Sequence, residues 1–147
     1  MTDPQTITQL IEDLQAAEVG TRGLDARICA LLRIGKKPLP LWLSNWEGKI
    51  MAIKSRCFAM HIDGTRGANW EPSLVTTSID AAMTTIPEGL VVTLTGHTNK
   101  NPRDLAFICA LAYGPSSADF VLEGARSFPL AICIASLYAI LKELETT

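Results

Sequence analysis

The chain has 147 residues, of which 48% are hydrophobic and 19% are charged, and its formal net charge is −2. This length and composition predict one globular domain over residues 1–147 with a sizeable buried core. The slight acidity argues against binding to duplex nucleic acid, because that contact requires several Lys and Arg side chains on one face. The opening residues MTDPQTITQL lack the basic and apolar regions of a signal peptide, so we expect a cytoplasmic protein.

Two amphipathic patterns open the chain. The run DPQTITQLIEDLQAAEVG has apolar residues at helical spacing, which predicts a helix over residues 4–18. The run TRGLDARICALLRIG shows a second pattern, in which Thr21 is suited to cap the start and Gly35 to end the helix. The link between the two patterns is short, so we expect a helical hairpin within one domain.

The middle of the chain changes character. Residues 36–70 contain repeated Pro and Gly around short apolar runs, which favours loops with strands near 50–54 and 57–62. The run TTSIDAAMTTIPEG then predicts a short helix over 78–86, with Asp80 in the first turn, where the helix dipole favours a carboxylate.

The last third combines strands with one strongly apolar helix. The runs GLVVTLTGHT, DLAFICALAY and SADFVLEGAR favour strands, and turn-rich segments separate them, so we expect a small, largely antiparallel sheet. Residues 128–141 are apolar on nearly every side, contain Ser136 and are shorter than the roughly 20 residues of a membrane span. They predict a core helix between the sheet and another helix or subunit. The fold class that follows is α+β, a three-layer α-β-α sandwich around the small sheet.

The four cysteines stand singly among apolar neighbours and form no C-x-x-C pair. In a cytoplasmic protein this pattern favours reduced, buried thiols over disulfides. The fragment CFAMHID, which joins Cys57, His61 and Asp63, supplies at most half of a metal site. We therefore expect neither a metal nor a cofactor.

Two histidines invite comparison with two-histidine phosphoesterases, which pair each imidazole with a hydroxyl two residues later. Asp63 follows His61 at that spacing, and Asn99 follows His97, so both hydroxyls are missing. The chain also lacks the phosphate-binding and nucleophile motifs G-x-x-x-x-G-K-S/T, G-x-G-x-x-G and G-x-S-x-G. We expect a protein without catalytic residues.

A site for an anionic nucleotide has more support in the sequence. Arginines stand at the starts of the second and last predicted helices, where free N–H groups favour phosphate, and further basic residues lie between two predicted strands. An aromatic ring could stack on a base. The alternative is that these arginines are ordinary surface charges or ion-pair partners and the aromatics belong to the core. The candidate ligand-binding residues are Arg22, Trp70, His97, Asn99, Lys100, Arg103 and Arg126.

Three runs, LIEDLQAAEVGTRGLDARICALL, TTSIDAAMTTIPEG and FPLAICIASLYAILKE, resemble in this order the blocks of the phage ABA sandwich family of small phage and prophage proteins. The resemblance leaves residues 36–70 largely uncovered. It implies a three-layer α-β-α fold and a phage origin, and carries no established activity. At the level of fold alone, the chain is also similar to Thoeris anti-defence sponge proteins, from which no functional residue is carried over.

The leading hypothesis is therefore a homo-oligomeric protein of the host bacterial cytoplasm that sequesters a cyclic nucleotide-derived immune signal. The alternative is a structural or protein-interaction protein that acts through an oligomeric surface. A third reading, a cyclic-nucleotide phosphodiesterase, requires a base that the sequence does not clearly supply.

Overall fold

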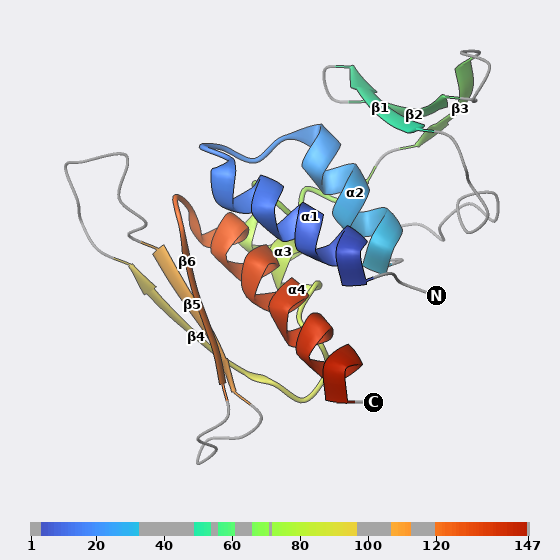
Figure 1. Ribbon diagram of the computed structural model, residues 1–147. Coiled ribbons are helices and arrows are strands. Elements are labelled where there is room, and N and C mark those ends of the chain that lie inside the picture. Colours follow the sequence, from blue (N-terminus) through green and yellow to red (C-terminus); the bar gives the residue numbers. More distant parts are fainter. Residues whose placement is uncertain are drawn as a thin grey trace.

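The computed structural model describes residues 4–32, 49–53, 56–60, 66–70, 72–96, 107–112 and 120–146 (Figure 1). Of the first three strands it describes the backbone only. The described helices are α1 (Pro4–Ala16), α2 (Arg22–Leu32), α3 (Ile79–Met83) and α4 (Phe128–Thr146). The described strands are β1 (Lys49–Ile53), β2 (Arg56–Met60), β3 (Arg66–Trp70), β4 (Val91–Gly96), β5 (Phe107–Ala112) and β6 (Phe120–Ala125).

The strands form two antiparallel sheets of three strands each, with the orders β1-β2-β3 and β4-β5-β6. In the second sheet Leu94 lies opposite Cys109, and Cys109 lies opposite Glu123. Residues directly opposite each other share a face of the sheet. Because Cys109 is fully buried and β5 packs on α4, this register defines which side chains face the helix and which face away from it.

Helix α4 occupies the centre of the fold. Leu130, Ile134 and Leu137 are fully buried, and the helix contacts α1, α3, β5 and β6. Its start is capped by Ser127, whose hydroxyl accepts a hydrogen bond from the Leu130 N–H at 3.4 Å. The predicted core helix is confirmed, and it continues five residues beyond the predicted end at 141, to Thr146.

Helices α1 and α2 form the predicted hairpin. Thr21 caps α2, because its hydroxyl accepts a hydrogen bond from the Leu24 N–H at 3.2 Å. An ion pair of 2.6 Å joins the Arg27 guanidinium on α2 to the Asp13 carboxylate on α1. The apolar stripe of α1 is buried and α1 packs on α4, as the helical spacing predicted; its members are Ile7, Leu10, Ile11 and Leu14.

The protein is therefore of the α+β class, with the predicted antiparallel sheet at β4–β6. Among the described elements, the helices all lie on one side of this sheet, with α4 next to the strands and α1 beyond it (Figure 1). The predicted α-β-α sandwich has helices on both sides of the sheet. The reason for the difference is α4 itself: being apolar on every side, it takes the middle layer and is covered by the sheet, α1 and α3.

The smaller elements follow the sequence less closely. Helix α3 is capped by Ser78. It ends at Met83, and turns replace the remainder of the predicted helix over 78–86. Strands β1 and β2 match the predictions near 50–54 and 57–62, whereas β3 was not predicted. None of the described helices combines the length and the hydrophobicity that crossing a bilayer requires.

Candidate functional site

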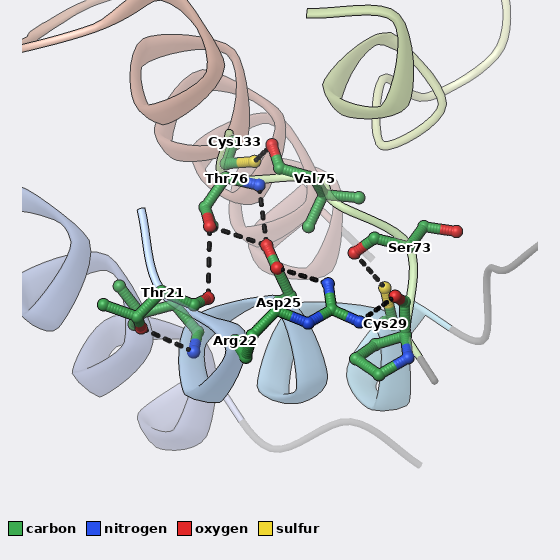
Figure 2. A network of polar contacts seen from close by, with 10 residues as sticks. Thr21, Arg22, Asp25, Cys29, Ser73, Val75, Thr76 and Cys133 are labelled. Atoms are coloured by element: carbon green, nitrogen blue, oxygen red, sulfur yellow. Dashed lines mark hydrogen bonds and ion pairs between the residues drawn. The ribbon is translucent and has the colours of Figure 1, made fainter. Parts of the chain in front are cut away.

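A buried polar network forms around the first turn of α2 (Figure 2). Its centre is Asp25, whose side chain is fully buried. One carboxylate oxygen accepts hydrogen bonds from the Thr76 N–H at 2.8 Å and the Thr76 hydroxyl at 2.6 Å. The other oxygen pairs with Arg22 Nη1 at 2.7 Å. A buried carboxylate is tolerated only when it is paired and hydrogen-bonded, and this one meets both conditions.

The network holds the segment 72–76, which leads from the first sheet to α3. Arg22 Nη2 donates to the Pro72 carbonyl at 2.6 Å, while the Cys133 thiol donates to the Val75 carbonyl at 3.2 Å. Gly20 fits closely against the same segment, because a Cβ atom there would lie 2.2 Å from the Thr76 carbonyl oxygen. We call this arrangement the Asp25 network. It fastens segment 72–76 between α2 and α4.

The buried thiols are poorly suited to react as nucleophiles. Cys29, Cys109 and Cys133 are buried and unoxidised, as predicted for them, while the side chain of Cys57 lies outside the described residues. Burial raises the pKa of the Cys109 thiol to about 11. Burial, and then the charge of nearby Asp25, also raises the pKa of the Cys133 thiol. A thiol reacts as its thiolate, so both groups are poor nucleophiles at neutral pH.

No metal site emerges from the part of the chain that the structure describes. Within those ranges, no three side chains of His, Cys, Asp or Glu gather in a way that could hold a metal ion.

The structure describes the complete side chains of two predicted ligand-binding residues, Arg22 and Arg126. Both guanidinium groups contact protein atoms. Arg22 is held in the Asp25 network. Arg126, between β6 and α4, places Nη1 3.3 Å from the Ala17 carbonyl oxygen and 3.5 Å from that of Ala16. These carbonyls end α1, where the helix dipole favours a cation. The arginines thus have the contacts of ion-pair and capping residues.

The other predicted site residues are less fully placed. Trp70 ends β3 opposite Cys57, and its side chain lies outside the described residues. The remaining four lie in the sequence between β4 and β5 and fall entirely outside the described residues: His97, Asn99, Lys100 and Arg103.

The ends of β4 and β5 do show where that connection leaves the sheet. The Phe107 ring packs edge-on against Phe128, with ring centroids 4.9 Å apart, and a Cβ atom at Gly96 would lie 2.8 Å from the Phe128 ring. Phe107 also lies opposite Ala125, the residue before Arg126. The backbone thus brings both ends of the 97–106 connection to the end of the sheet where Arg126 lies. The described backbone does not place Trp70 at that end of the sheet.

An unpredicted feature lies on the side of β4–β6 that faces away from α4. Side chains alternate between the two faces of a strand, so the neighbours of buried Cys109 and Leu111 point outward. Val91 is 42% exposed and Leu122 is 56% exposed. None of the outward-facing residues is charged. We call those whose side chains the structure describes the outer sheet face: Val91, Thr93, Thr95, Ile108, Ala110, Ala112, Leu122 and Gly124.

The alternation of β4 was the available signal for this face. In VVTLTG the residues Val92 and Leu94 point to α4, while the threonines point outward. These threonines are uncharged, so β4 contributes no charge to the outer sheet face. Comparisons with known proteins add no assignment, since no family model, curated protein or solved structure matches the chain.

Proposed function

We propose that the protein acts by binding rather than by catalysis, and that the outer sheet face is its binding surface. The observation that carries this proposal is an exposed sheet face with eight uncharged positions, in a chain whose helices cover the opposite side. The solvent side of an antiparallel sheet is usually polar, whereas this face carries Val91, Ile108 and Leu122 among uncharged neighbours. A face of this kind is suited to contact another protein surface.

The buried polar groups support a binding role. Both oxygens of the Asp25 carboxylate accept hydrogen bonds from side chains or backbone of the protein itself. The high pKa of the Cys109 and Cys133 thiols makes them unsuited to nucleophilic attack. The Asp25 carboxylate and these two thiols are therefore poorly suited to act as catalytic groups.

Photo-crosslinking in cells tests the proposed surface. A photoreactive phenylalanine analogue replaces Leu122 in one variant and Val19 in the other. Val19 is a matched control because it is apolar, 68% exposed and located in the turn between α1 and α2, outside the outer sheet face. We expect a discrete crosslinked protein from position 122 and none of comparable yield from position 19. Equal yields from the two positions would refute the proposed surface.

The second candidate function is sequestration of a cyclic nucleotide-derived signal by a phage protein in the host cytoplasm. One observation favours it: both ends of the connection that contains four predicted ligand-binding residues, His97, Asn99, Lys100 and Arg103, lie at the same end of the sheet as Arg126. The sequence of this connection contains Lys100 and Arg103, whose charges would favour an anion.

Release of bound ligand tests this second candidate. The purified protein is incubated with a panel of cyclic nucleotides and cyclised ADP-ribose products, washed and denatured, and the released compounds are identified. Intact ligand supports sequestration, altered ligand supports hydrolysis, and no retention removes the candidate. Replacing Lys100 and Arg103 with Ala should weaken retention about tenfold or more, the usual loss for charge-assisted phosphate contacts.

A further inference from the structure

The edge strands of the two sheets differ in how they are protected. An edge strand presents backbone N–H and C=O groups that another strand can bond, and proteins usually block such edges with charged residues or irregular pairing. Strand β1 contains Lys49, and β3 contains Arg66 and pairs with β2 through a register shift. Strand β6 carries Glu123, which lies opposite buried Cys109 and therefore points inward. The edges at β1, β3 and β6 thus each have a blocking feature.

Strand β4, the remaining edge, has none of these features. Its sequence VVTLTG contains neither a charged residue nor a proline, and its six residues pair with β5 without a register shift. Helix α4 packs chiefly on β5 and β6, and among the described elements β4 pairs with β5 alone. In an antiparallel strand alternate residues direct their N–H and C=O groups to opposite sides. The side of β4 away from β5 is therefore a regular, uncharged row of backbone donors and acceptors.

We propose that this edge binds an extended segment of a partner protein, which joins β4–β6 as an added strand. The row of backbone groups determines the chemistry of the partner, because an extended main chain repeats its own donors and acceptors at the same spacing. The inference concerns the edge of the sheet. It is independent of the proposed role of the outer sheet face.

The side chains of β4 restrict the sequence of the added strand. Val92 and Leu94 face α4 and are partly buried, so apolar side chains beside them would remove more of their surface from water. A charge at those positions would be desolvated without a partner. Val91, Thr93 and Thr95 face the other way and are exposed, and β-branched neighbours pair well with them. We therefore expect an uncharged segment, rich in β-branched residues and without proline.

Peptide selection with the purified full chain tests the inference. A displayed library of random peptides of about eight residues, enough for one strand, is enriched on the protein. We expect uncharged, β-branched peptides that bind with dissociation constants on the order of 1–100 µM. The best peptide is then made in two versions, N-methylated at odd or at even positions. Since an edge strand uses one side of the peptide, one version should bind at least about tenfold more weakly than the other. No enriched peptide, or equal affinities of the two versions, would overturn the proposal.

Leu94 and Glu123 provide matched variants, because both lie opposite Cys109 in one row of the sheet. Leu94→Glu gives β4 the inward carboxylate that β6 carries and should weaken peptide binding at least about tenfold. Glu123→Gln changes the opposite edge and should alter the affinity less than about twofold. Circular dichroism checks that both variants are folded. A folded Leu94→Glu protein with wild-type affinity would place the peptide elsewhere.

Amide hydrogen exchange of the wild type gives a readout that needs no variant. The bound peptide should slow exchange at alternate residues of β4 and leave β6 unchanged. Protection of β6 instead, or of neither strand, would overturn the proposal even if Leu94→Glu does not fold. Protection of β4 that rises with protein concentration without peptide would identify a second copy as the occupant and would also overturn it. A crosslink from position 122 without any enriched peptide would leave the outer sheet face standing while the edge inference fails.

Discussion

Replacing Asp25 with Ala should strongly destabilise the fold. The substitution leaves the Arg22 guanidinium, whose side chain is only 15% exposed, without its carboxylate, and it leaves the buried Thr76 N–H without an acceptor. Breaking a buried pair in this way costs about 3–5 kcal/mol. The total free energy of unfolding of such a domain is about 5–15 kcal/mol. We therefore expect the urea midpoint to fall by about 2 M, for an m value of about 2 kcal/mol per M.

The chain contains its own control for this prediction. The ion pair between Arg27 and Asp13 has nearly the same length, 2.6 Å against 2.7 Å for the pair of Arg22 with Asp25, but its side chains are 40% and 39% exposed. Asp13→Ala should cost about 0.2–1 kcal/mol, as exposed pairs do. The comparison is made by urea unfolding at pH 7, followed by circular dichroism. Equal losses in the two variants would show that burial does not determine the role of Asp25.

Three further predictions follow from other parts of the structure. Gly20→Ala should lower the thermal midpoint, because its Cβ would lie 2.2 Å from the Thr76 carbonyl oxygen. Gly23→Ala would make only an ordinary contact of 3.9 Å with Thr21 Oγ1 and should stabilise by about 0.4–1 kcal/mol; calorimetry showing equal shifts would contradict this. Burial raises the pKa of Glu123, so the native state holds its proton more tightly than the unfolded state, and the free energy of unfolding should fall as pH rises above about 4.3. Urea unfolding between pH 4 and 8 should show a flatter profile for Glu123→Gln, and an unchanged profile would count against the assignment. Cys109, with its pKa near 11, should react with iodoacetamide at pH 8 about a hundredfold more slowly in the native than in the unfolded protein, as peptide mass spectrometry can measure; comparable rates would mean that the thiol is accessible.

The helices and the second sheet were largely predictable because their periodicity is strong. The apolar stripe of α1 and the three β-leaning runs at β4, β5 and β6 appear in the structure where the sequence placed them. The order of layers was not predictable in the same way. An apolar helix such as α4 requires cover on several sides, but its sequence does not say whether a strand or a helix supplies each side. Strand β3 was missed because Gly67 interrupts its short run.

The polar contacts were harder to predict than the fold. Asp25 stands on the buried side of α2, four residues before Cys29 and three before Ile28, and a carboxylate at an apolar position was a signal for a buried network. Its partner Thr76 lies 51 residues away, and nothing local in the sequence indicates that pairing. Arg22 was proposed as a ligand-binding residue, with an ordinary ion pair as the alternative. Its guanidinium pairs with Asp25 of the same helix, and ligand binding by Arg22 stays a prediction.

The central position of α4 has a consequence for synthesis. A ribosome makes the chain from its N-terminal side, so α1, α2, α3 and the strands of both sheets all emerge before residue 128. Until α4 follows, the apolar stripe of α1 and the inner side of β5 lack the surface against which they pack. The core therefore closes late, after nearly seven-eighths of the 147 residues have been made. A nascent chain stalled before that point would expose both apolar surfaces and be a substrate for chaperones and proteases.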